Sequence, residues 1–276
     1  MTFAGPTPCT IRAMLLPYLE GEIREAFDRW LAGTLERFLP PLNFTELRKG
    51  VQAVSSLYVE RRGGGRLGAR STEGLGKRAA LATYYAALHF ITAHHAVRMI
   101  GPETFGPLRR VLDLGCGTGA TGASVSLTLS GLPSVLGIDR LGWAVDEARR
   151  TWESLRIPAR GVRGDVPLAA PKAAAGELLC FGWSLGEFDD ETRGAAYRYI
   201  CSALHRGASL LVLEPIAGRI VPWWSEWGES LADQGVRSEL IRVVIERPSF
   251  VRDMDKAASL DHQIIGARVL AGRTKA

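Results

Sequence analysis

Hydrophobic residues recur at helical spacing through roughly the first hundred positions of the chain. Between Leu15 and Leu31 they follow one another mostly at intervals of three and four, which predicts an amphipathic helix with one face on a core. The pair Pro40–Pro41 ends that segment, because proline lacks the N–H that a helix needs. Two more helices are predicted, over Phe44–Val59 and over Gly76–Ile100.

From Arg109 onward, short β-rich runs alternate with helical stretches. The predicted strands are Arg110–Leu114, Val135–Asp139, Arg160–Arg163, Leu178–Phe181 and Ser209–Glu214. The predicted helices are Thr118–Leu129, Trp143–Leu155, Glu191–Leu204 and Pro222–Asp233. Such alternation is typical of βαβ units, and right-handed crossovers then produce a doubly wound, mostly parallel sheet.

Two further strands are predicted towards the C-terminal end, over Leu240–Glu246 and Gln263–Arg273. We predict no helix of ordinary length between them and therefore expect an antiparallel pair. The predicted fold class is α/β, a Rossmann-like doubly wound sheet with a C-terminal antiparallel strand pair and an N-terminal helical region. We expect residues 1–105 to form that helical region, as a lid or substrate-recognition element, and residues 106–276 to form the α/β domain.

The composition fits a globular protein, with 46% hydrophobic and 23% charged residues among 276. No stretch of 18 uncharged apolar residues predicts a transmembrane helix, and Met1–Leu16 has neither a signal-peptide layout nor a myristoylation start. The four cysteines form no C-x-x-C pair, which is typical of a reducing compartment. We therefore expect a cytoplasmic protein without a zinc or iron–sulfur centre.

Basic residues gather in one glycine-rich segment. Six basic and two acidic residues between Glu60 and Arg78 give it a net charge of +4, close to the +5 of the whole chain. Gly63–Gly65 predict a mobile loop there. Two interpretations stay open: a solvated surface loop, or an arm at Arg61–Arg70 that contacts the phosphates of RNA.

A glycine-rich motif, Val111–Gly119, follows a predicted buried strand and opens a predicted helix. Glycines let the backbone turn sharply near a ligand, and the free N–H groups of the helix start attract polar ligand groups. The motif also satisfies the dinucleotide pattern G-x-G-x-x-G/A. Asp113 argues against that ligand, because a carboxylate two residues before the first glycine repels a pyrophosphate but suits the ammonium of a methionine moiety.

Carboxylates also follow the next two predicted strands. Asp139 ends the second strand, where it can accept hydrogen bonds from both hydroxyls of a ribose. Asp165 follows the third strand and can accept from an adenine amino group, while Val166 offers a backbone N–H beside it. The carboxyl ends of neighbouring parallel strands meet at one edge of a sheet, so these groups form one constellation.

This constellation resembles the class I S-adenosylmethionine (SAM)-dependent methyltransferases over about residues 109–273. The resemblance implies a SAM-binding domain at 106–276, methyl transfer as the activity, and cofactor contacts from Gly115, Gly117, Gly119, Asp139 and Asp165. Our candidate set adds residues in the same loops and at the end of the fourth strand: Asp113, Cys116, Arg140, Val166, Gly182 and Trp183.

The fourth strand of this fold ends beside the transferred methyl group. Ser184 or Glu187 could orient a nucleophile there; alternatively, Glu187 precedes a helix that Asp189 and Asp190 cap. No N/D-P-P-Y or N-P-P-F motif follows this strand, which disfavours methylation of a base or glutamine amino group. The tryptophans at 223, 224 and 227 either line a substrate pocket or pack on the sheet.

A second resemblance is to the mitochondrial small ribosomal subunit methyltransferase-like family. It rests on Tyr85–Val97, Trp183–Phe188 and Leu213–Pro215. His89 and Ile91 stand where that family usually has Arg and Pro, and its iron–sulfur cysteines are absent after Cys201. The three histidines of the helix at 76–100 have no carboxylate on their face, so we expect packed or surface side chains rather than metal ligands.

Three functions follow from these patterns. The first is methyl transfer from SAM, with ribosomal RNA as one acceptor. The second is methyl transfer to a small molecule beneath a helical lid. The third is a non-catalytic SAM-binding factor in ribosome assembly. The acceptor atom and the oligomeric state stay open.

Overall fold

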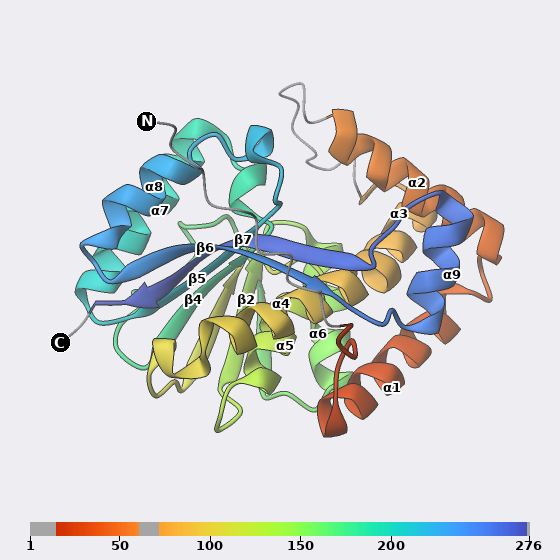
Figure 1. Ribbon diagram of the computed structural model, residues 1–276, viewed down its shortest axis with the longest axis horizontal. Helices are drawn as coiled ribbons and strands as arrows, with labels where there is room; N and C mark the ends of the chain where they lie inside the picture. Colours follow the sequence, from red (N-terminus) through yellow and green to blue (C-terminus); the bar gives the residue numbers. More distant parts are fainter. Residues whose placement is uncertain (1–14, 61–71, 275–276) are drawn as a thin grey trace, which may run out of the picture.

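The computed structural model describes residues 15–60 and 72–274. A single sheet of seven strands runs through its centre, in the order β3-β2-β1-β4-β5-β7-β6 (Figure 1). The strands are β1 (Arg110–Leu114), β2 (Ser134–Asp139), β3 (Ala159–Arg163), β4 (Glu177–Gly182), β5 (Ser209–Glu214), β6 (Val236–Val244) and β7 (Ile264–Arg273).

Strands β1 to β5 are parallel, whereas β7 lies antiparallel between β5 and β6. Leu112, at the middle of β1, pairs with Leu136 on one side and Leu179 on the other. The Rossmann-like fold with a C-terminal antiparallel pair is therefore confirmed. The order also differs from the 3-2-1-4-5-6 strand order of dinucleotide-binding sheets.

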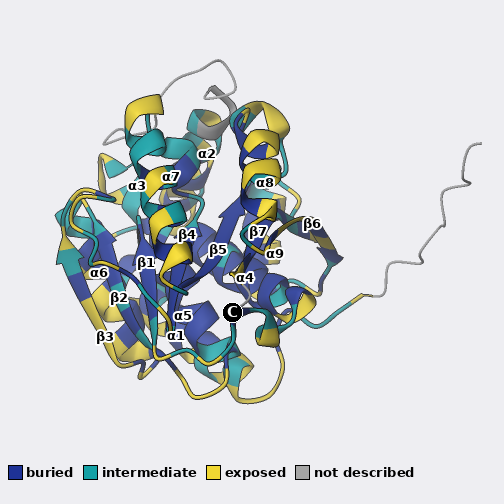
Figure 2. Cartoon of the chain, turned by 90° about the vertical axis from the view of Figure 1, so that its left-hand side faces the viewer, coloured by how far each residue is buried: buried dark blue, intermediate teal, exposed yellow. Residues whose placement is uncertain are grey.

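Helices cover both faces of the sheet. α7 (Asp190–His205) and α8 (Trp224–Ala232) pack on one face, and α4 (Ala86–Ile100), α5 (Ala120–Thr128) and α6 (Gly142–Ser154) lie on the other. Successive residues of a strand point to opposite faces, so Val111 joins one core and Leu112 the other. Figure 2 shows the buried strands between these helical layers.

The N-terminal helices pack on the face that carries α4 and α5. They are α1 (Gly21–Phe38), α2 (Phe44–Glu60), α3 (Leu75–Ala80) and the π-helical turn η3 (Leu81–Tyr85), which leads into α4. The three predicted helices are confirmed, but α1 begins later than the apolar spacing indicates. Leu16 instead forms a bridge with Ile245, donating its N–H to the Val244 carbonyl at 2.9 Å. Pro17 follows directly and cannot donate in a helix.

A helix does separate the last two strands, so the expectation of none was wrong. α9 (Ser249–Ala258) buries Val251, Met254 and Ala258, which are spaced by three and four residues. It packs against α2. The spacing was present in the sequence, and the helix forms part of the connection between two neighbouring antiparallel strands.

The N-terminal helices share one hydrophobic core with the sheet. Phe27 and Trp30 of α1 pack their rings on Phe90 of α4, with centroids 5.2 and 5.7 Å apart. Arg37 of α1 also pairs with Glu147 of α6, donating at 3.0 Å to Oε2 and more closely to Oε1. The helical region is thus joined to the α/β domain by packing and by charge.

The tryptophans at 223, 224 and 227 are buried and belong to the core under α7 and α8. The ring of Trp227 packs at a tilt on Tyr197 of α7, with centroids 4.9 Å and planes 52° apart. These side chains pack on the sheet and do not line the cavity described below. Among the described helices, none is long and apolar enough to cross a membrane.

Candidate functional site

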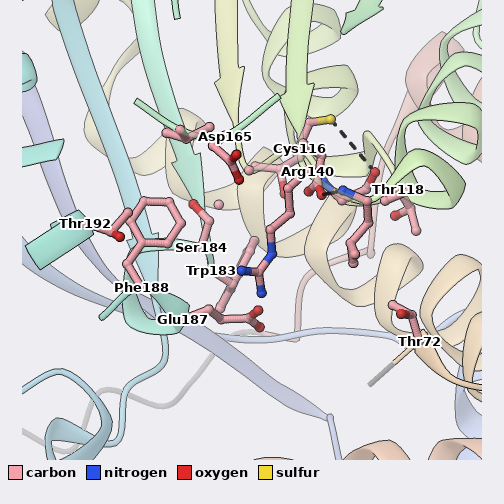
Figure 3. Close-up of a pocket in the computed structure, with 18 of the residues that line it drawn as sticks. Thr72, Cys116, Thr118, Arg140, Asp165, Trp183, Ser184, Glu187, Phe188 and Thr192 are labelled. Carbon is pink, nitrogen blue, oxygen red and sulfur yellow. Dashed lines mark hydrogen bonds between the residues drawn. The ribbon is translucent and has the colours of Figure 1, made fainter. Parts of the chain in front are cut away.

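A cavity of about 490 Å³ opens at the carboxyl ends of β1 to β4 (Figure 3). Open α/β sheets bind ligands at this edge, and the volume suits a small-molecule site. The loops after the four strands form one side, and the turn η3 with α4 forms the other.

The glycine loop after β1 forms part of the wall through two glycines with different surroundings. At Gly115 (φ +75°) an added Cβ would lie 2.6 Å from the Cβ of Ser184, so only glycine fits. At Gly117 (φ +51°) an added Cβ would meet no protein atom within 4 Å. Because Gly117 lines the cavity, the bare backbone there leaves room for a ligand to come close.

Asp139, at the end of β2, lies beside this loop. Its Oδ2 accepts from the Gly117 N–H at 3.0 Å and its Oδ1 from the Leu141 N–H at 2.9 Å. Burial raises the pKa of Asp139, and these backbone donors partly oppose that effect. Each carboxylate oxygen keeps lone pairs for a second donor, so the side chain is positioned to accept from ligand hydroxyls.

Asp113 and Gly119 lie behind the loop and do not line the cavity. The Asp113 carboxyl is fully buried and accepts from the Gly122 N–H at 3.1 Å; its Oδ1 has no partner among the described residues. Burial raises the pKa of Asp113 to about 7. Gly119 faces α6, where an added Cβ would meet Ala148 at 2.9 Å. Both residues support the loop from its far side.

The remaining candidates at β1 to β3 line the cavity. Arg140 is exposed and points into it in Figure 3. Asp165 is exposed and Val166 buried, both in the loop after β3. Burial raises the pKa of the Cys116 thiol well above its ordinary value, so Cys116 is a neutral wall residue rather than a nucleophile.

The chain after β4 is held firmly. Trp183 has φ +55°, a left-handed conformation that costs a non-glycine residue about 1–2 kcal/mol. Its N–H donates to the Leu213 carbonyl at 2.7 Å. The Ser184 hydroxyl donates to the Leu114 carbonyl at 2.9 Å and is buried. Ser184 therefore ties two strand ends together, and its proton already has an acceptor.

Glu187 ends a short 3-10 turn, η5 (Leu185–Glu187), and lines the cavity next to Phe188. Asp189 caps α7, accepting from the Thr192 N–H at 2.6 Å. The alternative interpretation is therefore right about a cap at Asp189 and wrong about one at Asp190, which is the first residue of α7 and pairs with Arg193. The loop thus brings Glu187 and Phe188 to the same wall as Trp183.

Several residues that line the cavity were outside the candidate set, and His89 is one of them. His89 of α4 lines the cavity, and its ring stacks on Trp183 with centroids 4.1 Å apart and planes 6° apart. Burial lowers the pKa of His89 to about 4. Its neighbours do pack, as expected: His94 bonds Thr128 at 2.9 Å and His95 bonds the Tyr18 carbonyl at 3.1 Å. Only the aromatic and small residues around position 89 hinted at a cavity wall.

Two further hypotheses from the sequence concern the basic segment and a metal site. Arg61–Arg70, the proposed phosphate-contacting arm, lies outside the described residues. In the described part of the chain, no cluster of His, Cys, Asp and Glu side chains could hold a metal ion.

No model of a known protein family matches the chain, and no curated protein matches it. Solved structures similar to it include a SAM-dependent methyltransferase from Aquifex aeolicus, with 14% identity over 67% of this chain and 92% of that one, at a TM-score of 0.45. The O-methyltransferase TomG from Streptomyces achromogenes, solved with SAM, shares 16% identity over 66% and 78% of the two chains (TM-score 0.42).

A third similar structure is the plantazolicin methyltransferase BpumL, with 13% identity over 83% of this chain and 98% of that one, at a TM-score of 0.43. These neighbours are methyltransferases of the class I fold that the motifs resemble. Their low identities and TM-scores carry no argument about activity, which has to come from the site itself.

Proposed function

We propose that this chain binds SAM in the cavity and transfers its methyl group to an acceptor. The observation that carries the proposal is the shared wall of Gly117 and Asp139. Gly117 leaves open space where a Cβ would stand, and its N–H holds the Asp139 carboxylate at 3.0 Å beside that space. A nucleoside needs these two features together: close approach to backbone, and a carboxylate for its ribose hydroxyls.

The other cavity residues fit the rest of the cofactor. Asp165 and Val166 suit an adenine ring, and Gly115 with Gly117 suits the methionine chain. Asp113 would act on the ammonium through its electric field, because it lies behind the loop rather than in the lining.

The charge of the lining favours SAM over a dinucleotide. Among the described lining residues, the carboxylates outnumber the single permanently charged cation, Arg140; they are Asp139, Asp165, Glu187, Asp189 and Glu191. These carboxylates repel the negative charges of a pyrophosphate, whereas they stabilise the positive charges of a sulfonium and an ammonium. Trp183 adds an aromatic face, which also attracts cations.

When bound, SAM supplies a methyl group on a positively charged sulfur, ready for attack by a nucleophile. The chain's own contribution would be positioning and exclusion of water, since methyl transfer needs little acid–base help for many nucleophiles. The strand ends held by Trp183 and Ser184 give a rigid wall for that positioning.

A small molecule is the acceptor that the cavity favours over RNA. The helical region closes one side of the cavity through Leu81, Tyr85 and His89, which makes a walled pocket. The pocket reaches beyond Trp183 to Phe188 and Thr192, so the acceptor side is not filled by side chains as a non-catalytic binding factor would require.

The test is calorimetric titration with SAM and S-adenosylhomocysteine. Asp139→Ala should weaken both affinities at least tenfold, about 1.4 kcal/mol. Gly117→Ala should weaken them while costing only about 1–2 kcal/mol of stability, because its Cβ meets the ligand rather than the protein. Asp146→Ala is the control, since that exposed carboxylate on α6 pairs with Arg149 at the surface.

No binding of either compound to the wild-type chain would refute the proposal, and unchanged affinity of Asp139→Ala would remove Asp139 from the site. The acceptor class is tested by supplying SAM with a tritiated methyl group to total RNA, protein extract and metabolite extract in parallel. Label in the metabolite fraction alone is expected, and label in RNA would point to the other acceptor.

A further inference from the structure

The acceptor side of the cavity is built around one stacked pair. His89 and Trp183 lie face to face at 4.1 Å, and both line the cavity. They come from α4 and from the end of β4, segments almost a hundred residues apart. A ring pair of this kind is a flat platform next to the place where β4 ends.

Both members are held in place. Trp183 keeps its left-handed backbone through the bond to Leu213. The π-helical turn η3 precedes α4, and π-turns within helices occur frequently at functional sites. Tyr84 of that turn is fully buried and donates to Asp255 of α9, which also accepts from Arg247 at 2.8 Å. This anchor fixes the helix that presents His89.

His89 itself has spare hydrogen-bonding capacity. Within the described residues, neither nitrogen of its ring has a hydrogen-bond partner, whereas one ring nitrogen of His94 and one of His95 are hydrogen-bonded. Its pKa of about 4 keeps the imidazole neutral near pH 7. A neutral imidazole has one nitrogen that accepts a hydrogen bond. The cavity therefore offers an acceptor atom beside an aromatic face.

We propose, resting on the function proposed above, that the methyl acceptor is a small aromatic molecule with a hydroxyl group, and that His89 receives the proton of that hydroxyl. The ring of the acceptor lies on the aromatic side of the cavity with Trp183 and Phe188. Its hydroxyl donates to the free nitrogen of His89. An acceptor of this kind needs a proton acceptor, whereas a neutral amine does not.

The reaction balances as follows. The acceptor oxygen forms a bond to the methyl carbon as the carbon–sulfur bond breaks, and sulfur keeps that electron pair and loses its positive charge. The O–H bond breaks, and its proton moves to His89. The imidazolium then releases the proton to water, and the products are a methyl ether, S-adenosylhomocysteine and one proton.

Binding of 1-naphthol in the presence of S-adenosylhomocysteine tests the proposal without turnover. Naphthalene, which has the same rings and no hydroxyl, is the matched ligand. The wild-type chain should bind 1-naphthol at least tenfold more tightly than naphthalene. His89→Phe keeps a ring on Trp183 but no nitrogen, so it should lower the affinity for 1-naphthol to that for naphthalene and leave naphthalene unchanged.

His205→Phe is the control, because His205 is exposed at the end of α7. It should bind both ligands as the wild type does. His89→Gln restores an acceptor atom and should recover part of the preference for 1-naphthol in binding. Thermal unfolding of each variant checks that the chain is folded.

Transfer of tritium from SAM to 1-naphthol should occur with the wild type and fall at least a hundredfold in His89→Phe, in line with the loss of a general base. Equal affinity for the two ligands in the wild type, or an unchanged preference in His89→Phe, would overturn the proposal. Either result leaves the proposed SAM binding intact if S-adenosylhomocysteine still binds, so the two failures are distinguishable.

Discussion

The two halves of the cavity are built in different ways. The half proposed for the cofactor comes from three consecutive strand ends, where the Gly117 N–H donates to the Asp139 carboxylate. The half proposed for the acceptor depends on His89 and Trp183, which meet only because α4 packs across the sheet. A local motif therefore specifies the first half, and tertiary packing specifies the second. Variants that disturb only the packing should separate the two.

The largest expected effect concerns the docking of α1 on α6. Glu147 is only 4% exposed, and Arg37 is its ion-pair partner. Arg37→Ala leaves a buried, unpaired carboxylate, so we expect a loss of about 4 kcal/mol in the free energy of unfolding. Urea denaturation measures it. Affinity for S-adenosylhomocysteine should change less than threefold, because neither Arg37 nor Glu147 lines the cavity.

The matched control is Arg29→Ala, which breaks an exposed pair with Glu25 on the same helix. Surface pairs of this kind contribute at most about 1 kcal/mol. Equal losses in the two variants would show that α1 is not held through Glu147. A parallel loss of cofactor affinity in Arg37→Ala would show that the two halves are not independent.

The same difference explains what could be predicted from the sequence. The succession of strands and helices, the glycine loop and the position of Asp139 at a strand end follow from local patterns, since a strand, a glycine turn and a helix start occupy adjacent positions. The strand order was not predicted. His89 was interpreted as a packed or surface residue, because its partner Trp183 is distant in the chain and no periodicity indicates a stacking contact. The lid role of residues 1–105 stays a prediction.

The direction of individual side chains could not be predicted from the sequence either. Asp113 has the position expected of an ammonium partner, yet its carboxyl turns towards the Gly122 N–H and away from the cavity. Ser184 stands beside the cavity, yet it bonds Leu114. A sequence motif indicates which residues stand at a strand end. It does not indicate whether each side chain faces the ligand or the loop behind it.

Asp113 supplies a prediction about pH. Its pKa is about 7 in the folded chain, against an ordinary value of 3.8, because burial disfavours the charged form. A raised folded-state pKa means that stability is present below pH 4 and is lost as pH rises through 7. Each pKa unit corresponds to about 1.4 kcal/mol, so this loss amounts to about 3 kcal/mol between pH 5 and pH 8.

The Asp113→Asn side chain cannot ionise, so the variant should not lose stability through this group as the pH rises. The variant's free energy of unfolding, measured in urea, should gain about 3 kcal/mol relative to the wild type from pH 5 to pH 8. Asp146→Asn, on the exposed side of α6, should show no such gain. A constant difference between Asp113→Asn and the wild type would mean that Asp113 finds a further partner when it is charged.

The smallest expected effect distinguishes support from chemistry at Ser184. Its hydroxyl donates to the Leu114 carbonyl, so Ser184→Ala should cost about 1 kcal/mol of stability, the usual net worth of one hydrogen bond. Because the hydroxyl proton is already hydrogen-bonded to Leu114, the affinity for 1-naphthol in the presence of S-adenosylhomocysteine should change less than twofold. The substitution removes only the hydroxyl and keeps the Cβ of Ser184, which packs close to Gly115.

A tenfold loss of 1-naphthol affinity in a normally folded variant would instead make Ser184 a direct partner of the acceptor. The cavity would then have two acceptor-binding groups, and the role assigned to His89 would be shared.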